Sequence, residues 1–296
     1  MIVIARSVGR LGNHLELYAH FIAAAREYGV TLANPCFAEY ADCFVGTKND
    51  PWCRYPTREH SQNKRLSLGR RRVQAKATYL AARTLAHLRL RWGPAVAIRL
   101  KGESPLDLGA EAFASMVQRH PLLFVQGWCF RCSALLAKHA DAVRRHLQIT
   151  DEHRLNVDRT IEQARGDSDF LVGVHVRHGD YATWKNGQHF YPLAKYAGWM
   201  RQIVKAFPDR NVRFMVCSEK PLDLELFAGL HVRFGPGHPV EDMYSLADTD
   251  LILGPPSTFT IWASFYGETP LMVLEHAEQR LDREQLQRLG RSRCVA

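Results

Sequence analysis

Apolar and polar residues alternate along the chain in a way that predicts an α/β protein. The run 1–6, apolar except for Arg6, predicts a first strand, and a turn at 9–12 follows it. Apolar residues then recur at every third or fourth position as far as Gly29, which predicts a helix that this glycine ends. The run 30–33 predicts the next strand. Strand, turn, helix and strand in this order are typical of the start of a parallel α/β sheet.

The same alternation continues to the end of the chain. In the first half it predicts a helix at 71–92, a strand at 122–125 and a helix at 133–147. In the second half it predicts strands at 170–176, 212–217, 231–234, 250–253 and 270–274, and helices at 192–206, 222–228, 240–247 and 257–266. We therefore predict two doubly wound α/β domains, 1–150 and 151–296, with the boundary within 148–152.

The composition favours a soluble protein of a reducing compartment. The chain has 296 residues, of which 46% are apolar, and this is enough to bury a core in each half. No run is long and apolar enough for a membrane helix, and the first residues lack the basic region of a signal peptide. Seven cysteines, an odd number, do not suggest a disulfide framework in a chain of this size. We therefore expect a cytoplasmic location.

Most of the positive charge lies in one segment. The formal net charge is +9, but residues 54–101 hold 13 lysines and arginines against the single acid Glu59. One interpretation is a nucleic-acid-binding protein that uses this segment, although it contains no zinc motif, RNP-like motif or helix-turn-helix. A second is a basic helix, 71–92, that lies on an anionic membrane. A third is that this helix packs on the amino-terminal domain and keeps a solvated basic rim; its apolar arc comprises Val73, Ala77, Leu80, Leu85, Leu88 and Trp92.

The segment 172–181 is the strongest candidate for a functional site. It is an apolar strand that ends in His175, Arg177, His178 and Asp180. Ligands of open α/β sheets bind outside the carboxyl ends of the strands, where these side chains fall. Arg177 is suited to bidentate contact with a phosphate. The alternative is that Arg177 and Asp180 form a local ion pair and that His175 belongs to the core.

Two further segments also join a strand to a helix. The strand at 250–253 is followed by a helix that starts with Ser257 and Thr258, which predicts a phosphate site at the helix amino terminus. The alternative there is ordinary capping of the helix by Ser257. Gly9 to His14 lies between the first strand and the first helix, but its glycine spacing fits neither GxGxxG nor a Walker loop. On its own it predicts a plain turn.

Together these segments resemble the fucosyltransferase superfamily, which includes the α1,2-fucosyltransferases of glycosyltransferase family 11, the core α1,6-enzymes and the protein O-fucosyltransferases. Gly9 to His14 resembles their Gly-Arg/Gly-Leu/Phe-Gly-Asn-Gln, and 175–181 resembles His-Val/Ile-Arg-Arg-Gly-Asp-Tyr. Residues 124–128 are similar to the family 11 segment Gly-Tyr-Trp/Phe-Gln. Glu241 to Leu246 and Ser257 to Ala263 are similar to its Asp-Phe-x-Leu-Met and Asn-Ser-Thr-Phe-Ser-Trp-Trp-Gly-Ala.

The resemblance implies a GT-B fold, in which two Rossmann-like domains face a central cleft. It implies a bacterial-type enzyme of glycan or polysaccharide biosynthesis that moves fucose from GDP-fucose to a glycan hydroxyl, with inversion and without a metal or other cofactor. Galactose O2 is the expected acceptor atom, which gives an α1,2 linkage. The donor would bind the carboxyl-terminal domain and the acceptor the amino-terminal domain. The partners are then a GDP-sugar and a glycan, not a nucleic acid.

The resemblance also assigns roles to individual residues. Arg177 would hold the diphosphate, His175 and Asp250 would face the nucleoside, Ser257, Thr258 and Phe259 would bind the phosphates, and Arg10, Gly12 and Asn13 would approach the fucose. The residues expected to be catalytic are Arg177, Asn13 and Asp180. For the general base, Asp180, His14 and His189 are the candidates.

This chain departs from the family pattern at His14, which replaces a glutamine, and at His178, which replaces the second arginine. Because that arginine helps to hold the donor in relatives, two alternatives stay open. One is transfer from another GDP-sugar, and the other is a module that binds a GDP-sugar without turnover.

Overall fold

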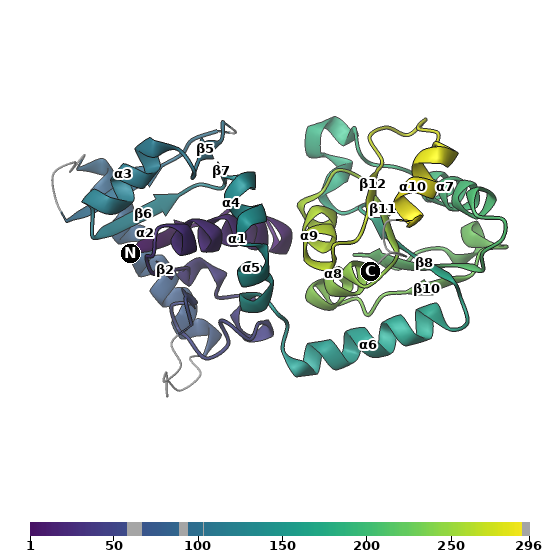
Figure 1. Cartoon of the computed structure of the whole chain (residues 1–296), viewed down its shortest axis with the longest axis horizontal. Helices are drawn as coiled ribbons and strands as arrows, with labels where there is room; N and C mark the ends of the chain where they lie inside the picture. Colours follow the sequence, from purple (N-terminus) through teal and green to yellow (C-terminus); the bar gives the residue numbers. More distant parts are fainter. Residues whose placement is uncertain (58–66, 89–93, 103, 292–296) are drawn as a thin grey trace. The chain divides into compact units, whose positions relative to one another are not determined.

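A computed structural model describes residues 1–57, 67–88, 94–102, 104–290 and the backbone of residue 291. The chain divides into two compact units, Met1–Thr150 and Asp151–Ala296, each with its own sheet (Figure 1). None of the described helices is long and apolar enough to cross a membrane. The six described cysteines are free thiols, and Cys294 lies outside the described residues.

The first unit is built on a five-stranded sheet in the order β3-β2-β1-β6-β4. Its strands are β1 (Ile2–Arg6), β2 (Leu32–Ala33), β3 (Arg54–Tyr55), β4 (Ala95–Arg99) and β6 (Leu122–Gln126). All neighbours are parallel except β2 and β3. Two short strands, β5 (Leu106–Asp107) and β7 (Phe130–Arg131), form a separate ladder. The chain leaves β1 toward β2 and later returns on the other side with β6, so the strand order switches direction between β1 and β6.

The helices of the first unit are α1 (Leu11–Glu27), α2 (Leu68–His87), α3 (Glu111–Arg119), α4 (Ser133–Lys138) and α5 (Ala140–His146), with the 3₁₀ turns η1 (Pro35–Phe37) and η2 (Ala41–Cys43). The continuous helix predicted at 133–147 is wrong, because it breaks at His139, whose φ and ψ of −114° and 19° are not helical. The last residues of the helix predicted at 71–92 lie outside the described residues.

The basic helix packs on the sheet of the first unit and keeps exposed basic residues, as the third interpretation has it, but its apolar arc is not the buried face. α2 buries Arg71, Thr78 and Ala82, whereas Val73 and Leu80 of that arc are 70% and 49% exposed. Thr78 and Ala82 are small and let the helix approach the sheet closely. Arg71 is accommodated because its guanidinium donates to two backbone carbonyl oxygens of the neighbouring loop.

The second unit has a fully parallel sheet in the order β10-β9-β8-β11-β12. Its strands are β8 (Phe170–Val176), β9 (Val212–Ser218), β10 (Val232–Phe234), β11 (Leu251–Gly254) and β12 (Leu271–Val273), all close to the predicted runs. The chain builds β8, β9 and β10 in one direction and then adds β11 and β12 on the other side of β8. The strand order therefore switches direction between β8 and β11.

The helices of this unit are α6 (Asp151–Arg165), α7 (Leu193–Ala206), α8 (Pro239–Ala247), α9 (Thr258–Gly267) and α10 (Arg283–Arg291), with the 3₁₀ turns η3 (Asp180–Ala182), η4 (Trp184–Gly187) and η5 (Leu224–Phe227). The sequence predicted neither α6 nor α10. The helix predicted at 222–228 is only the short turn η5.

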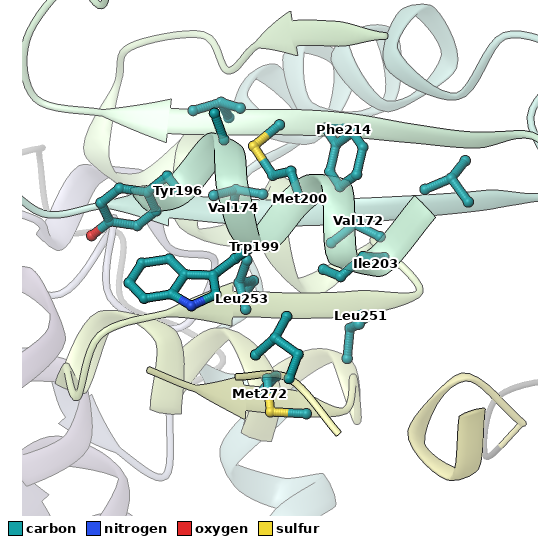
Figure 2. Packing of buried hydrophobic residues seen from close by; sticks show 14 of the residues in the cluster. Val172, Val174, Tyr196, Trp199, Met200, Ile203, Phe214, Leu251, Leu253 and Met272 are labelled. Atoms are coloured by element: carbon teal, nitrogen blue, oxygen red, sulfur yellow. The ribbon is translucent and has the colours of Figure 1, made fainter. Parts of the chain in front are cut away.

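The core of the second unit fixes the strand that carries the strongest motif. α7 packs Trp199, Met200 and Ile203 against Val172 and Val174 of β8 (Figure 2). These helix positions lie on one face at the spacing i, i+1 and i+4, and the two valines lie on one face of the strand. Each fully buried side chain of this size stabilises the unit by about 1.5–3 kcal/mol. The end of β8 is thus held by a rigid core.

Candidate active site

The ends of β8 and β11 bring the two main motifs of the second unit together. The strands are adjacent and parallel, with Leu253 in register with Val174, so 177–181 and 255–259 leave the sheet at the same edge. Gly254 permits this approach, because a β carbon at that position would lie 3.2 Å from the β carbon of His175. This edge is the switch point of the sheet, where open α/β sheets bind ligands.

His175 is a neutral, buried imidazole at this edge. Its ring stacks on Phe259, with ring centres 4.6 Å apart and planes 22° apart. Burial lowers the pKa of His175 to about 3, and the positive charge of Arg177 lowers it in the same direction. Its Nδ1 is buried without a hydrogen-bond partner among the described residues. The structure thus brings His175 and Phe259 together, and one ring nitrogen of His175 has no partner among the described residues.

Arg177 is held by two carboxylates. Its Nη1 donates to Glu219 at 2.5 Å, and its Nη2 pairs with Asp180 at 2.8 Å. The guanidinium also lies over the ring of Tyr181, 5.3 Å from its centre. Its Nε is buried and has no partner in the described part of the chain. The structure therefore contains the Arg177–Asp180 ion pair, and a phosphate would have to share the guanidinium with these carboxylates.

Ser257 caps the helix that follows β11. Its Oγ accepts the N–H of Phe259 at 3.1 Å, and its carbonyl oxygen accepts the hydroxyl of Thr260 at 3.0 Å. The hydroxyl of Tyr181 donates to the carbonyl oxygen of Pro256, which ties the loop after β8 to the start of α9. Ser257 therefore caps α9, as the alternative interpretation of this segment expected. The helix amino terminus still directs its partial positive charge to this edge.

Asp250 does not belong to this edge. It precedes β11 and lies at the amino end of the strand, about 13 Å from the carboxyl end at roughly 3.3 Å per residue. Its carboxylate accepts two hydrogen bonds from Arg165, at 2.7 and 3.1 Å, and one from the N–H of Leu171 at 2.8 Å. The structure therefore corrects the prediction that Asp250 faces the nucleoside. Asp250 is a structural residue that joins α6 to the sheet.

Asp242 of α8 is a carboxylate that does lie at this edge, and the sequence analysis gave it no role. It is 7% exposed and accepts the N–H of Gly237 at 3.0 Å. Its backbone oxygen is 3.7 Å from the thiol of Cys217, which is in register with His175. Burial raises the pKa of Asp242 to about 6. In the sequence, the feature that could have indicated a role for Asp242 is an acidic residue within the largely apolar run of α8.

Two of the histidines point into an aromatic cluster. Nε2 of His178 lies 2.7 Å from the carbonyl oxygen of Tyr191, and Nδ1 of His189 lies 3.2 Å from the Tyr191 hydroxyl. His189 is 8% exposed, whereas the side chain of Asp180 is 48% exposed. Of the base candidates in this unit, only Asp180 is open to an acceptor.

The other residues that the sequence predicted for the site follow β1 in the first unit. Gly9 has a φ of +87°, and a β carbon there would lie 2.1 Å from the side chain of Asn13, so this turn requires glycine. Arg10 is the cap residue of α1, and Gly12 and Asn13 lie in its first turn. The ring of His14 is 3.2 Å from the hydroxyl of Ser7, and burial lowers the pKa of His14.

Sequence comparison assigns the family. The profile of glycosyltransferase family 11 matches residues 125–283, more than half of the chain. The chain belongs to glycosyltransferase family 11. The match includes the loops after β8 and β11, so the residues at the switch point of the second unit lie within the family domain of this glycosyltransferase. No curated protein matches the chain in a sequence search.

The fold of this family 11 protein is similar to those of solved fucosyltransferases. A mutant FUT1 of Arabidopsis thaliana in complex with GDP has a TM-score of 0.57 at 15% identity, over 95% of this chain and 71% of that one. NodZ α-1,6-fucosyltransferase soaked with GDP-fucose has a TM-score of 0.52 at 18% identity, over 93% and 94%. POFUT1 in complex with GDP has a TM-score of 0.52 at 12% identity, over 92% and 98%. The predicted GT-B-type α/β fold is confirmed.

Proposed function

We propose that this family 11 glycosyltransferase transfers fucose from GDP-fucose to a glycan hydroxyl, with inversion. The observation that carries the proposal is the grouping of His175, Arg177 and the amino terminus of α9 at the switch point of the second unit. The solved proteins of similar fold were studied with GDP or GDP-fucose, which supports the choice of donor. The family assignment supports turnover over simple binding.

In this proposal the diphosphate lies between Arg177 and the start of α9. Departure of GDP builds negative charge on the β-phosphate, and a guanidinium together with helix-end N–H groups stabilises that charge where it forms. Ser257, Thr258 and Phe259 supply the helix end. These groups are suited to replace a divalent metal, so we propose a metal-independent reaction.

The nucleoside is proposed to contact His175 and Asp242. Nδ1 of the neutral His175 ring has no partner among the described residues and can take part in a hydrogen bond with the nucleoside. The carboxylate of Asp242 accepts the N–H of Gly237, just after β10, and suits the amino and imino N–H groups of a guanine base. In this role Asp242 takes the place that the sequence analysis gave to Asp250.

The acceptor is proposed to bind the first unit and to react through galactose O2, which gives an α1,2 linkage. Arg10, Gly12 and Asn13 follow β1 and are proposed to approach the fucose. Asp180 is proposed as the general base, because its carboxylate is half exposed at the donor edge. Transfer from another GDP-sugar is the second candidate, since His178 stands where relatives have an arginine and its ring is directed to Tyr191.

We further propose a cytoplasmic enzyme that contacts an anionic membrane through α2. Val73 and Leu80 of this helix point away from the buried residues Arg71 and Thr78, since 3.6 residues per turn place them on the opposite side. Leu88 at the helix end is 60% exposed. Exposed basic residues flank this apolar stripe: Arg70, Lys76 and Arg83. Apolar side chains beside lysine and arginine are typical of helices that lie in a membrane interface.

The test of the main proposal is release of GDP from a panel of GDP-sugars, with galactosides as acceptors and EDTA present. We expect GDP-fucose to be consumed with EDTA and Arg177→Ala to lower kcat/KM by about 10²–10³. Arg159→Ala, at an exposed position of α6, is the control and should keep full activity. If wild type neither consumes nor binds any GDP-sugar, the proposal fails and the basic segment 54–101 becomes the place to seek function.

A further inference from the structure

The first unit contains a pocket at its own switch point. The pocket has a volume of about 390 Å³, within the range of small-molecule sites, and lies where β1, β6 and β4 end. Its lining includes Arg6, Arg99, Lys101, Gln126, Gly127 and Trp128. Since open sheets bind ligands at such crevices, the position alone favours a binding site.

The walls of the pocket carry only positive charge. Arg6, Arg99 and Lys101 are the ionisable residues that line it, and all three are exposed. In the described part of the chain, none of them is paired with a carboxylate; Arg6 lies over the ring of Tyr79 at 5.7 Å. Three cations that converge on one crevice attract an anion and bind it by charge-assisted hydrogen bonds.

The backbone is arranged to bring these cations beside Gln126. The register between β1 and β6 shifts after Ile4, so Arg6, and not the residue before it, is the partner of Gln126. On the other side of β6, Arg99 is also the partner of Gln126. The register shift thus pairs Arg6 with Gln126 on one side, and the regular β4–β6 ladder places Arg99 on the other.

The unsatisfied amide of Gln126 indicates a ligand site in the described part of the chain. Gln126 is 1% exposed, and neither its Nε2 nor its Oε1 has a hydrogen-bond partner among the described residues. A buried amide without partners is costly and is rare in native proteins. An amide that lines a pocket is satisfied when a ligand offers both a hydroxyl and an acceptor oxygen, as a sugar does.

Trp128 supplies an apolar wall. It is partly buried, and the guanidinium of Arg131 lies 5.1 Å from its ring centre. Gly127, with a φ of +128°, makes the turn between Gln126 and Trp128, and a β carbon there would lie 3.0 Å from the side chain of Leu100. The pocket therefore combines an aromatic side chain, an amide and three cations.

We propose that this pocket binds a negatively charged sugar residue of the acceptor, a uronic acid or a phosphorylated sugar. The proposal rests on the proposed transfer to a glycan and adds the class of acceptor. The cations hold the carboxylate or phosphate, Gln126 bonds the ring hydroxyls, and the pocket lies in the unit proposed to bind the acceptor.

The test is calorimetric binding of three probes to the full chain: methyl β-galactoside, its 6-phosphate and methyl β-galacturonide. We expect at least one charged probe to bind ten or more times more tightly than the neutral one. Arg99→Gln/Lys101→Gln should remove this preference, and the two substitutions are at exposed positions that do not support the fold. Arg119→Gln, an exposed arginine of α3, is the matched control. The two charged probes separate the carboxylate from the phosphate.

Gln126→Met is the second variant, since it roughly keeps the volume and removes the amide that has no partner in the described residues. We expect weaker binding of the charged probe with an unchanged or higher Tm, whereas a merely structural role predicts a lower Tm. Equal binding of charged and neutral probes, no binding of any probe, or full binding by Arg99→Gln/Lys101→Gln would overturn the proposal. GDP-fucose consumption is measured on the same samples. If GDP-fucose is not consumed, the proposed function fails, whereas the proposal of an anionic-sugar pocket is decided by the binding of the probes.

Discussion

The buried carboxylate of Asp242 lowers the stability of the folded protein at neutral pH. The pKa of Asp242 is raised by burial to about 6 in the folded protein, against 3.8 for an ordinary aspartate. The folded state therefore binds this proton more tightly than the unfolded state, so stability rises as pH falls from about 6 toward 4. Above pH 6 the charge costs about 3 kcal/mol, from 1.36 kcal/mol per pKa unit. A cost of this size is typical of a residue retained for function.

Asp242→Asn separates this cost from function. At pH 8 we expect an unchanged or higher Tm, because the buried charge is removed, together with a GDP affinity at least tenfold lower. In wild type, GDP affinity should fall as pH decreases through about 6, when Asp242 becomes protonated. Calorimetry with GDP and thermal unfolding across pH measure both effects. Asp209→Asn, at an exposed position, is the control. A variant that binds GDP as wild type does would remove Asp242 from the site.

At the residue scale, the sequence located the functional edge but not each of its side chains. His175 and Arg177 follow a strand, so their place at the carboxyl edge is predictable from strand direction. Asp250 precedes its strand, and the same rule places it at the opposite edge. Asp242 reaches the edge only through the packing of α8 beside β9, which no local pattern predicts. The pairing of Arg177 with Glu219 also joins residues distant in sequence.

At the scale of elements, periodicity predicted the parallel strands of the second unit well because they are buried apolar runs. It missed α6, in which only Val157 and Ala164 are buried and charged residues fill most other positions. For α2 it predicted the helix but chose the wrong face. Both faces of α2 carry small or apolar residues. Which face is buried depends on the carbonyl oxygens of Lys48 and Asp50, which accept hydrogen bonds from Arg71.

The exposed face of α2 gives a prediction about membrane contact. Val73→Ser/Leu80→Ser should leave the Tm unchanged, because both side chains are exposed. Binding to vesicles that contain anionic lipid should fall at least tenfold, since each apolar side chain contributes about 1.5–3 kcal/mol when it leaves water. Cosedimentation measures this binding. Leu155→Ser, a 59% exposed leucine of α6, is the control. If neither wild type nor variant binds anionic vesicles, α2 does not contact membranes.

At the scale of the whole molecule, charge and binding sites are divided between the two units. Counted from the sequence, residues 1–150 carry a formal net charge of +12 and residues 151–296 one of −3. The residues proposed to bind the nucleoside and the diphosphate all lie in the second unit. The positively charged pocket lies in the first. This division suits one unit specialised for the nucleotide and one for an acidic glycan.

This division predicts that the second unit binds GDP on its own. Its sheet is formed by strands of 151–296 alone, and its core cluster is drawn from the same residues, so it has the size and the buried interior of an independent domain. A fragment of residues 151–296 should fold cooperatively and bind GDP within about tenfold of the affinity of the full chain, because one contact group lost from the first unit costs about 1.4 kcal/mol or less. Circular dichroism and calorimetry test folding and binding, and Arg177→Ala in the same fragment should abolish binding without unfolding it. A folded fragment that does not bind GDP would instead assign a main share of the donor contacts to the loop that contains Arg10 and Asn13.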